Sequence, residues 1–129
     1  MPPSSKRILC LEDNIDDQGL IRFMLQQINA DYDVIILEDA VTAINLIASE
    51  TFDLFILDYG IAGSSGIEVC RWIRERDSDT PIMFFTGMTE REDRKTAIEA
   101  GANAYLIKPS NIEKFRDRVE SLLKFGVKY

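Results

Sequence analysis

The chain of 129 residues contains no histidine. Histidine is the side chain that most readily gains and loses a proton near neutral pH, and it is the commonest metal ligand in proteins. Its absence excludes histidine-dependent catalytic triads, histidine metal sites and a phosphohistidine within this chain. Chemistry that needs a histidine-borne phosphoryl group would therefore need a partner protein.

Long apolar runs are also absent. The longest stretches, such as residues 34–37 and 54–57, fall far short of the roughly 18 residues that cross a bilayer. The opening sequence MPPSSKR lacks the apolar core of a signal peptide. We therefore expect a cytoplasmic protein without a membrane-spanning segment.

Cysteine is scarce, and basic residues are outnumbered. Cys10 and Cys70 lie in apolar segments without the paired spacing of a zinc site or a disulfide framework, so we expect two reduced thiols in the core. Fifteen Lys and Arg against 22 Asp and Glu give a formal net charge of −7. This charge opposes attraction to nucleic acids and anionic membranes, and we expect neither as a direct partner.

The sequence does contain a regular alternation of two kinds of segment. Five short runs rich in Val, Ile, Leu and Phe are typical of buried strands: residues 7–11, 33–37, 52–57, 82–85 and 104–107. Between them, apolar residues recur at helical spacing, most clearly in Leu20, Ile21, Met24, Leu25 and Ile28. Strands that alternate with helices predict an α/β fold, with a parallel sheet covered on both faces.

Shorter signals indicate the ends of helices. Thr89 with Glu92, and Ser110 with Glu113, have the spacing of capping boxes and predict the starts of the last two helices. Gly101 is expected to cap the C-terminal end of the fourth helix.

One domain is expected from this length, with no repeat and no long linker. The domain should comprise residues 6–124. Residues 1–5 are expected to form a flexible N-terminus and residues 125–129 a C-terminal tail.

Polar side chains gather where the apolar runs end. Glu12 and Asp13 follow the first run, Asp58 the third, Thr86 ends the fourth and Lys108 follows the fifth. In an open parallel sheet, the carboxyl ends of the strands form the edge where ligands bind. If the first and third strands are neighbours, the three carboxylates converge there, although Asp13 and Asp58 are 45 positions apart (58 − 13).

Clustered carboxylates call for a cation, because two such charges about 5 Å apart repel by about 3 kcal/mol at an effective dielectric constant of about 20. Oxygen ligands of high charge suit Mg²⁺, which retains waters that a phosphate can replace. Lys108 adds a fixed positive charge and Thr86 a hydroxyl donor near a phosphoryl group on Asp58. The pattern predicts a phosphoryl-transfer site.

Each of these residues alone also has an ordinary structural explanation. Glu12 and Asp13 would suit the start of a helix, Asp58 a turn, Thr86 a loop and Lys108 a solvated surface. Their joint arrival at the ends of four apolar strands favours the functional interpretation.

Four segments resemble the receiver domains of two-component response regulators: ILCLED at 8–13, LFILD at 54–58, FFTG at 84–87 and GANAYLIKP at 101–109. The resemblance runs from about residue 6 to residue 124. It implies a doubly wound, flavodoxin-like fold with a five-stranded parallel sheet in the order 2-1-3-4-5. It also implies a phosphorylation switch that catalyses only its own phosphorylation and dephosphorylation. Its phosphodonor would be a histidine kinase or a histidine phosphotransfer protein.

The resemblance further implies a role for single residues. Asp58 would be the phosphoacceptor and would bind Mg²⁺, with Mn²⁺ as a substitute. Asp13 and the carbonyl of Gly60 would be the other direct ligands, and Glu12 would act through a bound water.

Thr86 and Lys108 would contact the phosphoryl group, and the Lys108–Pro109 peptide bond would be cis. Tyr105 matches the aromatic switch residue of the family. Its movement would alter the face made by the fourth helix, fifth strand and fifth helix, which is the candidate surface for partner binding or homodimerisation. That face carries Arg91, Arg94, Lys95, Lys114 and Arg118.

Two features depart from the common pattern or affect the lifetime of a phosphorylated state. Ala62 stands where the family usually has proline, and the small residues of segment 60–66 predict a more mobile loop. Gly60 and Met88 occupy the two positions that border the path of the hydrolytic water in the family. Neither can orient a water strongly, so hydrolysis should be slow.

Three other functions fit the sequence less well. An aspartate-nucleophile phosphohydrolase of the haloacid dehalogenase type would need a second Asp two positions after Asp58, where this chain has Gly60. A flavin or nucleotide binder would need a glycine-rich first loop, whereas EDNIDD at 12–17 would repel phosphate. A protein-interaction module that is not phosphorylated could use the same fold, but it would not require the five site residues.

Overall fold

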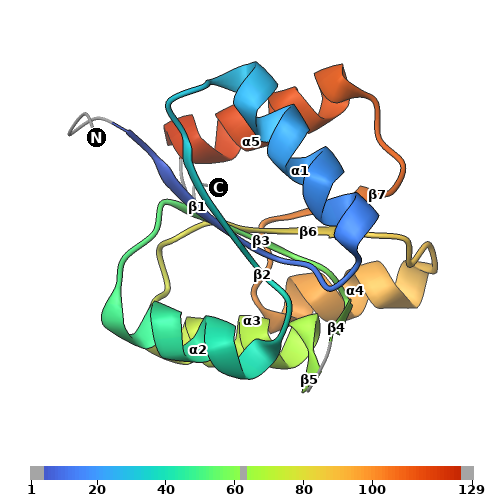
Figure 1. The fold of residues 1–129 in the computed structure, drawn as a ribbon. Helices are drawn as coiled ribbons and strands as arrows, with labels where there is room; N and C mark the ends of the chain where they lie inside the picture. Colours follow the sequence, from blue (N-terminus) through green and yellow to red (C-terminus); the bar gives the residue numbers. More distant parts are fainter. Residues whose placement is uncertain (1–4, 62–63, 126–129) are drawn as a thin grey trace.

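The structure is a computed structural model that describes residues 5–61 and 64–125. Most of the two expected loose ends, 1–5 and 125–129, therefore lies outside the described residues. Figure 1 shows the arrangement of the strands and helices. In chain order, the described elements are β1 (Arg7–Leu11), α1 (Ile15–Ile28), β2 (Asp33–Leu37), α2 (Ala40–Ser49), β3 (Leu54–Leu57), β4 (Gly60–Ile61), β5 (Ser64–Ser65), α3 (Gly66–Arg76), β6 (Ile82–Thr86), α4 (Arg91–Ala100), β7 (Ala104–Ile107) and α5 (Ile112–Phe125).

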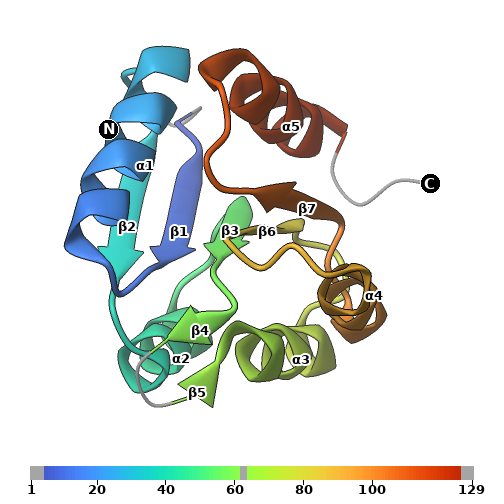
Figure 2. The ribbon, with the colours of Figure 1, turned by 90° about the vertical axis from the view of Figure 1, so that its right-hand side faces the viewer.

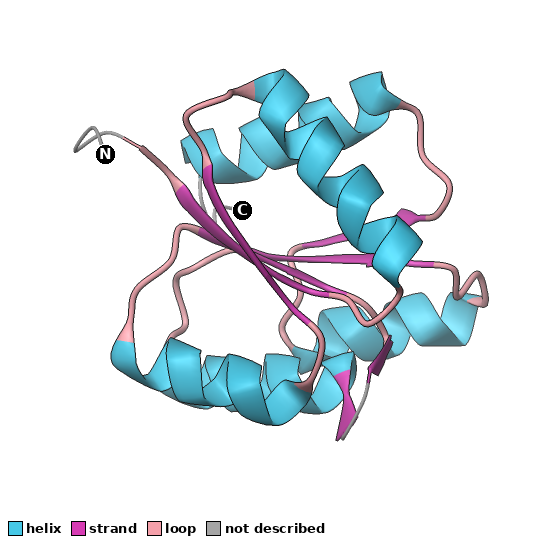
Figure 3. Cartoon of the chain, viewed as in Figure 1, coloured by secondary structure: helices cyan, strands magenta, loops and turns pink. Residues whose placement is uncertain are grey.

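Five strands form one parallel sheet in the order β2-β1-β3-β6-β7. Since β6 and β7 are the fourth and fifth strands of this sheet along the chain, the order is the predicted 2-1-3-4-5. The strand β1 pairs on both sides, with Ile8 opposite Val34 of β2 and Leu54 of β3. Helices α1 and α5 cover one face of the sheet, and α2, α3 and α4 cover the other (Figure 1, Figure 3). The predicted doubly wound α/β fold is confirmed.

Two apolar cores lie on the two faces of the sheet, because successive side chains of a strand point to opposite faces. In β1, Ile8 and Cys10 belong to the core under α1 and α5, and Leu9 and Leu11 belong to the core under the other three helices. The prediction of fully buried strands was wrong for β2, where only Val34 is buried. As an edge strand, β2 has a neighbouring strand on one side only.

Both cysteines are buried and free, as predicted. Burial raises the pKa of Cys10 to about 12 and the pKa of Cys70 to about 11. The two thiols therefore stay protonated at neutral pH and act as small core side chains.

The predicted cap of α4 was wrong by one residue. A capping box joins Glu90 and Asp93, and the N–H of Glu90 donates to Oδ2 of Asp93 at 3.2 Å. The sequence pattern had favoured Thr89 with Glu92. A carboxylate accepts a stronger hydrogen bond than a hydroxyl does, which favours the acidic pair.

The cap of α5 also differs from the prediction, whereas the end of α4 agrees with it. Oδ1 of Asn111 accepts a hydrogen bond from the N–H of Lys114 at 2.8 Å, in place of the predicted box between Ser110 and Glu113. The Ser110 hydroxyl instead donates to the carbonyl of Asn111. Gly101 ends α4 with a φ of 119°, a left-handed conformation that favours glycine.

Three further details differ from the sequence prediction or extend it. β3 begins at Leu54 rather than at residue 52, and Leu20 is 46% exposed rather than part of the buried stripe of α1. The short antiparallel pair β4–β5 was not predicted. Ala62 and Gly63 lie outside the described residues, so the mobility of their loop stays a prediction. None of the described helices has the length and apolar character needed to cross a membrane.

Candidate functional site

The predicted site residues lie at the carboxyl edge of the sheet, where the strands lead into loops. Glu12 and Asp13 follow β1, Asp58 follows β3, Thr86 ends β6 and Lys108 follows β7. β1 and β3 are neighbours, and β6 lies between β3 and β7. Figure 2 shows the β1–α1 loop and β4 at this edge. Four strands thus bring distant segments of the chain together here.

Lys108 is at the centre of the site. Its ammonium donates hydrogen bonds to Oε1 of Glu12 at 2.5 Å, Oδ2 of Asp17 at 2.9 Å and Oδ2 of Asp58 at 2.8 Å. Burial alone would lower the pKa of Lys108, but these hydrogen bonds outweigh burial and raise it above its ordinary value. Lys108 therefore carries a positive charge at neutral pH. The Lys108–Pro109 bond is cis, as the resemblance implied.

Glu12 is the acidic side chain that burial affects most, since the residue is only 1% exposed. Burial raises the pKa of Glu12, and the hydrogen bonds that it accepts from Lys108 and from the N–H of Asn14, at 3.1 Å to Oε2, oppose this effect. An unpaired carboxylate at this depth would be costly. Glu12 therefore needs the ammonium of Lys108 in the arrangement seen here.

Asp58 and Asp13 have different surroundings. The side chain of Asp58 is 15% exposed. Its Oδ1 accepts a 2.6 Å hydrogen bond from the N–H of Tyr59, while Oδ2 faces Lys108. Asp13 is exposed and is not one of the carboxylates paired with Lys108. The structure thus joins Glu12, Asp58 and Lys108 directly and leaves Asp13 on the solvent side of the site.

Thr86 and Tyr105 both form hydrogen bonds with the main chain of Met88, and not with the carboxylates of the site. Thr86 is 1% exposed, and its Oγ1 accepts a hydrogen bond from the N–H of Met88 at 3.3 Å. The hydroxyl of Tyr105 donates to the carbonyl of Met88 at 2.8 Å. Tyr105 already points inward and is buried, which raises its pKa to about 12.

Two residues that the sequence reasoning missed support this arrangement. Tyr59 contacts both Phe84 and Tyr105, with ring centroids 5.5 Å and 6.4 Å apart respectively. Gly66 lies against the main chain of Asp58, where a Cβ would collide with the carbonyl oxygen. Glycine occurs in many kinds of turn, so the presence of Gly66 in the sequence did not indicate this close approach.

Asp17 was missed as well. The sequence placed it in the acidic segment after the first strand, but gave no sign that its side chain would meet Lys108, which is 91 positions away. Only the packed orientation of α1 against the sheet brings the two groups together.

The oxygen-only donor set of the site suits a hard divalent cation such as Mg²⁺. Three carboxylates, those of Glu12, Asp17 and Asp58, contact one ammonium, and the exposed Asp13 follows Glu12 in the chain, so negative charge is in excess. Among residues 5–61 and 64–125, however, no group of three or more Asp, Glu or Cys side chains is arranged to hold a metal ion. Lys108 forms ion pairs with three of the four carboxylates.

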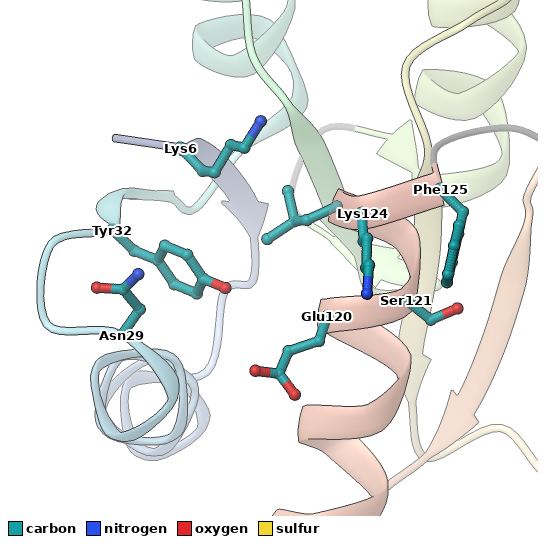
Figure 4. Close-up of a pocket in the computed structure, with 8 residues that line it drawn as sticks. Lys6, Asn29, Tyr32, Glu120, Ser121, Lys124 and Phe125 are labelled. Atoms are coloured by element: carbon teal, nitrogen blue, oxygen red, sulfur yellow. The ribbon is translucent and has the colours of Figure 1, made fainter. Parts of the chain in front are cut away.

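A separate pocket lies at the opposite edge of the sheet. It has a volume of about 560 Å³ (Figure 4). Its lining residues come from the segments before β1 and β2 and from the C-terminal part of α5: Lys6, Asn29, Tyr32, Glu120, Ser121, Leu123, Lys124 and Phe125. None of the site residues contributes to this pocket.

The fold and the site together define a class of signalling protein. The family model of the response regulator receiver domain matches residues 8–120. The chain therefore belongs to the receiver domains of two-component response regulators.

Individual relatives agree with this assignment. Response regulator ArlR of Staphylococcus epidermidis is 34% identical over 110 residues, which are 84% of this chain and 50% of that protein. The chain spans about half the length of the curated relatives that it matches.

Solved structures of the same class share the fold. A CheY-like response regulator receiver domain protein from Methanospirillum hungatei matches with a TM-score of 0.85 and 25% identity, covering 95% of this chain and 96% of that one. The non-phosphorylated HemR receiver domain from Leptospira biflexa matches with a TM-score of 0.83 and 27% identity, covering 93% and 95%.

Proposed function

We propose that this receiver domain, comprising residues 6–124, accepts a phosphoryl group on Asp58 in the cytoplasm. The donor is a histidine kinase or a histidine phosphotransfer protein, and the phosphohistidine lies in that partner because the chain itself has no histidine. The observation that carries the proposal is the 2.8 Å contact between Oδ2 of Asp58 and the ammonium of Lys108. This pair places a nucleophilic carboxylate beside a fixed cation.

The proposed transfer is a displacement at phosphorus. A carboxylate oxygen of Asp58 forms a bond to phosphorus while the bond between phosphorus and the donor imidazole breaks. The electron pair of that bond stays on the imidazole, which carries a proton on its other ring nitrogen and leaves as neutral histidine. Lys108 and the Thr86 hydroxyl stabilise the charge on the phosphoryl oxygens.

The residues that would hold Mg²⁺, or Mn²⁺ in its place, are Asp13, Asp58 and the carbonyl of Gly60, with Glu12 acting through a water. When bound, the ion would neutralise part of the charge on the phosphoryl oxygens. Asp13 supports this assignment because it is exposed and is not engaged by Lys108.

The output of the switch is proposed to pass through Thr86 and Tyr105. Both are tied to Met88 in the β6–α4 loop, so a shift of Thr86 toward a phosphoryl group would change the hydrogen bonds of this loop. The face of α4, β7 and α5 would then bind a downstream protein or a second copy of the chain. Ile98 of α4 and Ile107 of β7 give this face exposed apolar surface.

The experiment that tests the proposal is phosphate labelling. The protein is incubated with Mg²⁺ and a small acyl phosphate, and the added mass is located by peptide mass spectrometry. We expect one phosphate on the peptide that contains Asp58 and none on Asp58→Asn, with Asp53→Asn as a control that keeps the label. A wild-type protein without label, or a labelled Asp58→Asn variant, would contradict the proposal.

A further inference from the structure

Asp17 is the third carboxylate bound to Lys108, and it lies in the first turn of α1. Its N–H donates to Oδ1 of Asn14 at 2.9 Å, which caps the helix. Nε2 of Gln18 donates to the carbonyl of Glu12 at 2.8 Å. The first bond caps α1, and the second fastens its first turn to the residue that follows β1, so the helix is held where Asp17 reaches Lys108.

A general role at a helix start does not account for Asp17. Acidic residues in a first helical turn offset the helix dipole, and Asp16 and Asp17 are equally placed for that effect. Asp16 is exposed, whereas Asp17 is partly buried and lies 2.9 Å from the ammonium of Lys108. The specific contact distinguishes Asp17 from its neighbour.

The three carboxylates paired with Lys108 would be used differently in the proposed reaction. Asp58 forms a bond to phosphorus, and its charge then moves to the phosphoryl oxygens. Glu12 belongs to the proposed Mg²⁺ site. Asp17 does neither, so it is the partner of Lys108 that stays unchanged throughout.

We propose that Asp17 is a positioning residue, which holds the ammonium of Lys108 beside Asp58 so that it meets the incoming phosphoryl oxygens. This inference rests on the proposed function of Asp58. Without Asp17, Lys108 would keep its charge but would lose the one partner that does not take part in transfer. The chemical step would slow, while the affinity for Mg²⁺ would stay close to that of the wild type.

The test compares Asp17→Asn with Asp16→Asn in the full chain. Both variants remove one negative charge from the same helical turn. With saturating Mg²⁺ and acetyl phosphate, we expect the labelling rate constant of Asp17→Asn to fall about fivefold, as suits one partly exposed ion pair, and that of Asp16→Asn to stay at the wild-type value. Asp17→Glu, which keeps the carboxylate, should recover a large part of the rate.

Equal rates for Asp17→Asn and Asp16→Asn would overturn the inference, because helix electrostatics alone would then explain the effect. So would a defect in Asp17→Asn that disappears when the Mg²⁺ concentration is raised, since Asp17 would then act through the metal. Calorimetric titration with Mg²⁺ alone separates this second case.

A spectroscopic measurement reads the contact without any phosphate. The ¹⁵Nζ signal of Lys108, assigned by its loss in Lys108→Arg, should shift and exchange its protons faster in Asp17→Asn than in Asp16→Asn. An unchanged signal would overturn the inference. If the wild-type protein takes up no phosphate but the Lys108 signal responds to Asp17→Asn, the proposed function fails while the ion pair itself is established.

Discussion

The hydroxyl of Tyr59 donates a 2.6 Å hydrogen bond to the main-chain carbonyl of Asp93. Tyr59 directly follows Asp58, and Asp93 lies in the first turn of α4. One side chain therefore connects the segment of the proposed phosphoacceptor with a helix of the proposed output face. The contact of Tyr59 with Tyr105 links the same segment to β7.

Tyr59→Phe should weaken the attachment of α4. The variant keeps the ring contacts but loses the hydrogen bond, so we expect the free energy of unfolding to fall by about 1 kcal/mol. Amide hydrogen exchange should become faster in the first turn of α4. Tyr32→Phe is a suitable control, because the Tyr32 hydroxyl makes no hydrogen bond within the part of the chain that the structure describes. Equal exchange protection in the wild type and Tyr59→Phe would show that the bond does not hold the helix.

Two glycine-to-alanine substitutions should have opposite effects. At Gly66, the new methyl group would meet the carbonyl oxygen of Asp58, so we expect a loss of more than about 2 kcal/mol of stability together with impaired labelling. Gly19 lies within α1, where a new methyl group would have open space around it. Gly19→Ala should raise stability by roughly 0.5–1 kcal/mol. Urea unfolding measures both, and a Gly66→Ala variant as stable as the wild type would contradict the packing described for Asp58.

Magnesium binding should be weak in the unmodified protein, because Lys108 already neutralises part of the acidic charge of the site. Asp13→Ala should remove most of this binding, since Asp13 is the proposed carboxylate ligand that Lys108 does not engage. Isothermal titration calorimetry measures the affinity. Asp16→Ala is the matched control, because it removes the same charge from the first turn of α1, close to Asp13 in the chain. An Asp13→Ala variant that binds as well as the wild type would remove Asp13 from the proposed site.

The phosphorylated state should be long-lived without a helper protein. Met88 is 45% exposed but has no group that can activate water, and Gly60 has no side chain. We expect both Met88→Glu and Gly60→Asn to accelerate the loss of phosphate by supplying a group that orients water. No atom lies within 4 Å of the position that a Cβ would take at Gly60, so the second substitution fits without displacement. If the wild type lost its label within seconds and neither variant lost it faster, other residues would set the rate of hydrolysis.

The apolar runs were sufficient to predict the five strands of the parallel sheet, and the resemblance to receiver domains gave their order. β1, β2 and β7 begin and end at the predicted residues, because an apolar run bounded by charged or turn-forming residues has few alternatives. The helix starts were less certain for a local reason. Two overlapping capping pairs, Thr89 with Glu92 and Glu90 with Asp93, offer similar hydrogen bonds one residue apart, and only the packed helix distinguishes them.

Contacts between side chains could not be predicted in the same way. Convergence of Glu12, Asp58 and Lys108 followed from strand order alone, because strand ends share one edge. The contact between Asp17 and Lys108 depends on the rotation of α1 about its axis, and that of Gly66 with Asp58 depends on the path of the β3–α3 connection. Neither leaves a pattern in the sequence.

The place of β1 between β2 and β3 divides the sheet into an early half and a late half along the chain. β1 pairs with the next two strands in the chain, so the backbone pairing of β2, β1 and β3 involves only residues up to 57. β6 and β7 then add in turn to one side only. The acidic groups after β1 and β3 therefore belong to the early half of the sheet, and their ammonium partner after β7 belongs to the late half. A domain folds as a unit, and the core of β1 includes Phe115 and Val119 of α5. Folding of the whole domain is therefore what brings the lysine to the carboxylates.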